Sequence, residues 1–141
     1  MNKFTFTDLK LLETIQKEYA NDYIKNMEDA NNGVRNTRFY IPIDCQKVAK
    51  KMKADGEIVF NRLYFHLNNK YSYKDMNDNP VYFFVFEIDG LKHCINYGYL
   101  CSVLADLKDK KFKENLALSF SIISIIISIM VPIITCILKQ I

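Results

Sequence analysis

The sequence predicts an α+β domain followed by one C-terminal transmembrane helix. Three observations predict this architecture. The 23 residues from Leu116 to Leu138 carry no charged side chain, three earlier segments repeat apolar residues at helical spacing, and two apolar runs flank the turn dipeptide Asp89-Gly90. We therefore expect an α+β domain over residues 1–107, a basic stalk over 108–115 and a membrane span over 116–138.

The first helix is expected to follow Thr5 and to end near residue 27. Thr5 and Asp8 have the spacing of a capping box. The apolar residues that follow lie on one helical face: Leu12, Ile15, Tyr19 and Tyr23. Residues 31–37 are polar and predict a loop, and residues 38–42 predict a short strand that stops at Pro42.

Two short helices are expected next. Asp44 can cap the first, whose apolar residues follow at helical spacing: Cys45, Val48, Ala49 and Met52. The lysines of this helix face solvent: Lys47, Lys50, Lys51 and Lys53. After a turn at Gly56, helical spacing continues to Tyr71 through Phe60, Leu63, Tyr64 and Leu67.

A β-hairpin and a last helix complete the domain. The run "VYFFVFEI" is aromatic and β-branched, Asp89-Gly90 favours a tight hairpin turn, and "LKHCINY" predicts the returning strand. The last helix is marked by Leu100, Val103 and Leu104, and it can continue through "KDKKFKEN" into the span without a break.

Helix, strand, helix, turn, helix and hairpin is the element order of a winged helix, and residues 38–97 resemble a winged helix-turn-helix module. The resemblance implies groove or phosphate contacts from the second helix and one contact from the wing. These candidates are Asn61, Arg62, Asn68, Asn69 and Lys70 on the helix and Lys92 on the wing. The candidate ligand-binding or nucleic-acid-binding set also includes Lys47, Lys50 and Lys51, although a lysine face is often only a solvated face.

The uncharged segment predicts a single membrane span. At about 1.5 Å per residue it reaches roughly 35 Å, enough for a hydrocarbon core of about 30 Å. Cations precede the span and only Lys139 follows it, so we expect a tail-anchored protein of the cell inner membrane with a cytoplasmic N-terminus. The lysines that would meet lipid headgroups are Lys108, Lys110, Lys111 and Lys113.

Small and hydroxylated residues form a stripe along this span. With Ser121 set to zero and about 100° per residue, Ser124, Ser128 and Thr135 fall between about 300° and 340°. Ala117 joins them and Ser119 lies elsewhere. The stripe predicts a self-association face, because small residues let membrane helices approach closely. Two alternatives stay open: hydroxyls bonded to their own helix, and hydroxyls that line an aqueous path.

No pattern in the sequence predicts catalysis. Glycine-rich phosphate loops, metal-binding spacings and nucleophile elbows are missing, and His93 and Cys94 are strand neighbours that point to opposite faces. The four cysteines are expected to be thiols: Cys45, Cys94, Cys101 and Cys136. We expect a protein that is not an enzyme and has no catalytic residue, metal or cofactor.

Three functions remain open from sequence. The first is a membrane-anchored sensor or effector that forms a homo-oligomer, similar in outline to small membrane effectors of bacterial antiviral systems. The second is a membrane-tethered DNA-binding regulator, and the third is an adaptor that recruits a soluble protein. The expected partners are membrane lipid and further copies of the chain, with a nucleic acid, a nucleotide or a protein as the candidates at the cytosolic domain.

Overall fold

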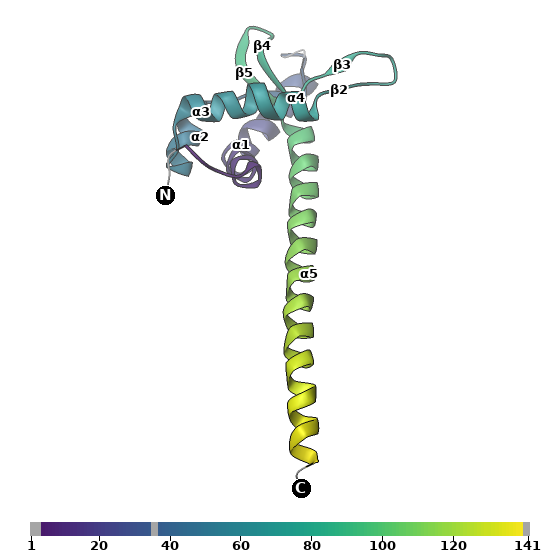
Figure 1. Cartoon of the computed structure of the whole chain (residues 1–141). Coiled ribbons are helices and arrows are strands. Elements are labelled where there is room, and N and C mark those ends of the chain that lie inside the picture. Colours follow the sequence, from purple (N-terminus) through teal and green to yellow (C-terminus); the bar gives the residue numbers. More distant parts are fainter. Residues whose placement is uncertain (1–3, 35–36, 140–141) are drawn as a thin grey trace. The chain divides into compact units, whose positions relative to one another are not determined.

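The computed structural model describes residues 4–34 and 37–139, and it contains two compact units, Met1–Ala105 and Asp106–Ile141. We call the first unit the N-terminal domain. It combines helices with two small sheets, in the order shown in Figure 1, and the second unit is helical. The prediction of mixed helix and sheet followed by one long apolar helix is confirmed.

The first helix, α1, runs from Asp8 to Asn31 and buries Leu11, Leu12 and Ile15. Its N-cap is Thr7, not Thr5, because the extended backbone of Thr7 places the hydroxyl 3.2 Å from the Lys10 amide, which donates to it. The helix also continues past residue 27, where sequence patterning placed its end. Near this end the Asn26 side-chain amide donates to the Arg38 carbonyl at 3.0 Å, which ties the last turns to the chain before β1.

The predicted pair of helices is present. After β1 (Tyr40–Pro42), α2 spans Cys45–Met52 and is capped by Asp44, as expected. Asp55 then caps α3 (Gly56–Asn61), which continues into the π-helical segment η1 (Arg62–Leu67) and α4 (Asn68–Tyr71). Sequence spacing predicted this run as one helix and did not predict its π-helical centre.

Four further strands form the rest of two sheets. β4 (Phe84–Ile88) and β5 (Leu91–Asn96) make the predicted hairpin, and β1 pairs with β5, giving the antiparallel order β1-β5-β4. A second, shorter hairpin joins β2 (Tyr73–Lys74) to β3 (Pro80–Val81). This hairpin was not predicted, because the apolar run that begins at Val81 indicated one continuous strand, whereas Val81 belongs to β3 and β4 begins at Phe84.

The core of the N-terminal domain lies between its helices and the three-stranded sheet. It draws side chains from α1, α2, the α3–η1–α4 run, the sheet and the first turns of α5. The largest fully buried side chains are Leu11, Leu12, Ile15, Ile41, Met52, Leu63, Leu67, Phe83, Phe84, Ile95, Leu100 and Leu104. Each such side chain contributes about 1.5–3 kcal/mol of hydrophobic stabilisation, so the start of α5 is part of the folded domain.

The last helix, α5, runs from Tyr97 to Leu138 (Figure 1). Pro132 lies inside this helix. Its C-terminal part is long and apolar enough to cross a membrane. None of the apolar window is buried within the chain, which distinguishes it from the core helix of a soluble protein. The helix begins before Leu100 because the Asn96 side chain accepts from the Tyr99 amide at 3.1 Å and caps the first turn.

Candidate functional site

The lysines of α2 pack against α1 through ion pairs. Lys47 lies 2.9 Å from a carboxylate oxygen of Glu18, and Lys51 contacts the other oxygen of that carboxylate. These contacts lower the pKa of Glu18, chiefly through Lys51 and then Lys47, and Glu18 raises the pKa of Lys47. A lowered carboxyl pKa stabilises the fold at pH values above the pKa that the group has in the unfolded chain. This contribution is lost as the pH falls through the pKa that the group has in the folded chain. Two of the three α2 lysines in the candidate set therefore hold helices together.

Three basic side chains of the second helix lie near one carboxylate of α1. Arg62 places Nε and Nη2 each 2.7 Å from Oδ1 of Asp8. His66 and Lys70 lie 3.9 Å from the other oxygen of the same carboxylate. Because Asp8 neutralises part of this positive charge, Arg62 and Lys70 attract a phosphate less strongly than the unpaired cations expected from the sequence would.

We expect Asp8→Asn to lower the free energy of unfolding by about 1 kcal/mol, because Arg62 loses charge-assisted hydrogen bonds at a partly exposed site. Chemical denaturation of the detergent-solubilised chain measures this change. The exposed Asp22 of the same helix provides the control Asp22→Asn. Equal losses in the two variants would contradict a specific role for the Asp8–Arg62 pair.

Asn68 holds two elements of the domain together. Its amide oxygen accepts hydrogen bonds from the Phe83 amide at 3.1 Å and the Phe84 amide at 3.0 Å. The same oxygen accepts from the Ser72 hydroxyl at 2.7 Å. The oxygen that the resemblance assigned to a base or phosphate is therefore engaged in joining α4 to β4.

The remaining candidates of this module lie on the surface. Asn61 and Asn69 are exposed on the second helix, Lys50 is exposed on α2, and Lys92 is exposed on β5 opposite Glu87. Exposed Phe65 also lies on the second helix, at a position where a DNA-reading helix would carry a polar residue. Contacts of these surface residues with a nucleic acid or ligand therefore stay predictions. The exposed Phe65 ring lies on the same helix as two of them.

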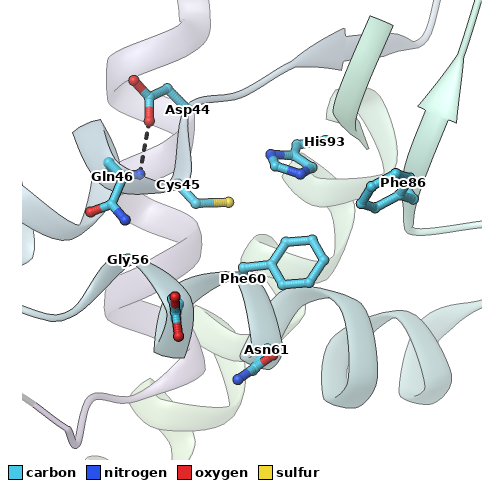
Figure 2. A pocket seen from close by; sticks show the side chains of 9 residues that line it. Asp44, Cys45, Gln46, Gly56, Phe60, Asn61, Phe86 and His93 are labelled. Carbon is cyan, nitrogen blue, oxygen red and sulfur yellow. Dashed lines mark hydrogen bonds between the residues drawn. The ribbon is translucent and has the colours of Figure 1, made fainter.

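A pocket of about 370 Å³ opens between the N-terminal ends of α2 and α3 and the β4–β5 hairpin (Figure 2). Asp44, Glu57 and Asn61 line it, with the rings of Phe60 and His93. None of the described residues that line it is Lys or Arg, so its charge opposes a phosphate. Among the nucleic-acid or ligand candidates only Asn61 lines this pocket.

His93 is the residue of this pocket that sequence reasoning underrated. Its backbone has φ of 55° within a strand, and its ring centroid lies 5.1 Å from that of Phe60 and 5.5 Å from that of Phe86. A positive φ costs a non-glycine residue energy, although His adopts this conformation more often than most. In the sequence, His93 was considered only together with the adjacent Cys94. No local pattern indicated that the Phe60 ring would contact it.

Cys45 also lines the pocket, and its chemistry argues against a nucleophilic role (Figure 2). Burial, followed by the nearby charge of Asp44, raises the pKa of the Cys45 thiol to about 11. The thiolate is the reactive form of cysteine, so an active nucleophile needs the opposite shift. Within the described residues no group of three or more His, Cys, Asp or Glu could hold a metal ion.

We expect native Cys45 to alkylate very slowly. At pH 8 a thiol pKa of about 11 leaves about a hundredfold less thiolate than the ordinary value of 9.0, before burial restricts access further. Iodoacetamide labelling followed by peptide mass spectrometry measures the rate, with the chain in denaturant as the control. Equal rates for Cys45 in the two states would show that the thiol is neither buried nor perturbed.

The lysines before the span are partly paired along their own helix. Lys110 lies 4.0 Å from Glu114, and Lys113 lies 2.7 Å from Asp109, which raises the pKa of Lys113. Such exposed pairs contribute little and can exchange for lipid headgroups. Lys108 and Lys111 are exposed on the same segment, so all four lysines stay headgroup candidates.

Three hydroxyls of the stripe bond to their own helix. Ser121 donates to the Ala117 carbonyl at 2.9 Å, Ser128 donates to the Ser124 carbonyl at 2.8 Å, and Thr135 donates to the Val131 carbonyl at 2.8 Å. These are the bonds expected from the alternative in which the hydroxyls bond to their own helix. Each hydroxyl oxygen still has acceptor capacity, so they do not exclude a contact with a second helix.

The first turn of α5 is fixed to several parts of the N-terminal domain. The Tyr97 amide donates to the Phe39 carbonyl at 2.9 Å, and the Tyr97 hydroxyl donates to the Gln16 carbonyl at 2.6 Å. The Tyr97 ring stacks on Tyr23 with centroids 4.5 Å apart. The start of α5 is therefore held by α1 and by the segment before β1.

Comparisons with protein-family models, curated proteins and solved structures find no match to this chain.

Proposed function

We propose that this chain is a non-enzymatic membrane-anchored sensor or effector, in which the N-terminal domain binds a ligand or partner and controls a self-associating span. The observation that carries the proposal is the extent of α5. Tyr97, Leu100, Val103 and Leu104 are buried in the domain, and the same helix continues to Leu138 through the apolar segment. A change at the first turn of α5 can reach the span without crossing a loop.

A winged-helix-like fold for the N-terminal domain is part of this proposal. The order of elements from α1 to β5 supports it, as does the sheet order β1-β5-β4, in which the strand before the helical pair joins the returning strand of the hairpin. Such modules bind proteins and ligands as well as DNA, so the fold alone selects no partner.

The charge distribution favours a sensor over a DNA-binding regulator. Asp8 neutralises part of the Arg62 and Lys70 charge, and Asp44 and Glu57 line the pocket beside the hairpin. DNA affinity depends mainly on unpaired cations near phosphates, and steep weakening by salt is its signature. An adaptor is the second candidate, because exposed Phe65 and half-exposed Phe86 could bury against a protein partner.

Self-association of the span is supported by its stripe and by Pro132. Proline has no amide hydrogen, so the Ser128 carbonyl four residues earlier loses its usual helical donor. Ser128 lies on the hydroxyl stripe, and an unsatisfied carbonyl in hydrocarbon costs several kcal/mol by order of magnitude. A hydroxyl from a neighbouring helix, or water in an oligomer, would satisfy it. We place the N-terminal domain in the cytoplasm, at the inner membrane, because cations precede the span.

The test replaces residues 116–138 by a Leu-Ala helix of equal length in the full chain. Light scattering in detergent then compares the protein mass with the 16.6 kDa of one chain. We expect several copies for the native chain and one copy for the replaced chain. A monomer in both would overturn the proposal and favour an adaptor, which needs only an anchor of sufficient length.

A further inference from the structure

A second pocket, of about 550 Å³, lies where the β2–β3 hairpin meets the first turn of α5. Its walls are aromatic: the rings of Phe39 and Tyr73 are 57% and 51% exposed, and Tyr99 meets Tyr73 edge to face with centroids 5.5 Å apart. Exposed aromatic rings that converge on a hollow leave ring faces open to a ligand. The volume is in the usual range for a small-molecule site, roughly 300–1,000 Å³.

The polarity of this pocket defines the chemistry of an occupant. None of the described residues that line it carries a charge, so a free phosphate or carboxylate would find no counter-ion. The tyrosine hydroxyls of the lining supply hydrogen-bonding edges, whereas the Asn96 side chain is buried and is bonded to the Tyr99 amide and the Tyr40 hydroxyl. An uncharged planar ring system with hydrogen-bonding groups on its edge satisfies both the apolar walls and these polar groups.

The pocket contacts residues that fix the start of α5. Asn96, which caps the helix through the Tyr99 amide, lines it together with Gly98. On the other side, Tyr73 and its cross-strand partner Val81 belong to a hairpin with only two paired residues in each strand (Figure 1). Such a short ladder is marginally stable alone, so a ligand against it could tighten both the hairpin and the helix cap.

We propose that this pocket is the ligand site of the N-terminal domain and binds a small, uncharged, planar aromatic or heteroaromatic molecule. Its regulatory meaning rests on the proposed sensor function, whereas its binding does not. A bound ring stacks on Phe39 and Tyr73 and bonds at its edge to a tyrosine hydroxyl of the lining. Occupancy then alters the cap from which the continuous helix α5 begins.

Adenosine is the probe, because it is uncharged, has a planar two-ring base and partitions little into detergent. Saturation-transfer NMR on the full-length protein measures its binding, with adenosine monophosphate as the charged counterpart. We expect saturable adenosine binding that Phe39→Ala or Tyr73→Ala weakens roughly tenfold, in line with the loss of one stacked ring. Phe65→Ala removes an equally exposed phenylalanine outside the pocket and is expected to leave binding within about twofold.

No saturable adenosine binding, equal binding by both pocket variants, or equal binding of the monophosphate would overturn the proposal. Melting temperatures of the variants confirm folding, and both replaced rings are half exposed, so neither change removes core packing. The mass of the same samples separates the two proposals. An oligomer that binds no adenosine overturns only the ligand site, whereas a monomer that binds it overturns only the association of the span.

Discussion

Joint replacement of Ser121, Ser124 and Ser128 by Leu is expected to weaken self-association about twentyfold while leaving membrane insertion intact. Three lost interhelical hydrogen bonds at about 0.6 kcal/mol each give this factor, and the bulkier side chains also prevent close approach of the helices. Insertion survives because leucine is more apolar than serine. Light scattering across a protein dilution series measures association, and carbonate extraction of membranes measures insertion.

Ser119→Leu is the matched control for this prediction. Ser119 lies off the stripe and donates its hydroxyl to the Asn115 carbonyl at 2.9 Å, as the stripe hydroxyls do to theirs. We expect this variant to associate like the native chain. A similar loss in the triple variant and the control would show that the effect is general to serine in the span, and it would refute a specific association face.

The second large effect is expected from Leu100→Ala. Leu100 is fully buried in the N-terminal domain although it belongs to the same helix as the candidate span. Truncation of such a leucine leaves a cavity and costs about 2–5 kcal/mol. We expect the N-terminal domain to lose this much unfolding free energy, measured by urea denaturation of the full chain in detergent.

Leu107→Ala provides the comparison within the same helix. Leu107 is only partly buried and lies in the second compact unit, so its truncation is expected to cost less than about 1 kcal/mol. If both variants lost the same small amount, the first turns of α5 would not be part of the domain core. The proposed coupling would then lack its physical basis.

Local sequence signals predicted the elements whose causes are local. Asp44 caps α2 through amides two and three residues away, and Asp89-Gly90 forms the hairpin turn with φ of 51° and 74°. The apolar span is equally local, because length and lack of charge define it. The winged-helix resemblance stays a proposal, and the β2–β3 hairpin between α4 and β4 was not expected from it.

Features that depend on distant contacts could not be predicted in this way. The start of β4 depends on the Asn68 side chain, which lies 15 and 16 residues before the amides that it binds. Arg62 appeared available until the fold brought Asp8 to it across 54 residues of sequence. The pocket at His93 likewise combines residues from α2, α3 and the β4–β5 hairpin, and no local pattern records that combination.

Cysteine cross-linking in native membranes tests the central claim most directly, namely that the span self-associates through its hydroxyl stripe. Two variants are compared, Ser124→Cys and Ile126→Cys, each in a Cys136→Ser background. On the helical wheel with Ser121 at zero, the thiol at position 124 lies at about 300°, on the stripe, and the thiol at position 126 lies at about 140°, on the opposite side. The account predicts rapid oxidative cross-linking of two chains through position 124 and little through position 126. Equal cross-linking at the two positions, or none at either, would contradict it.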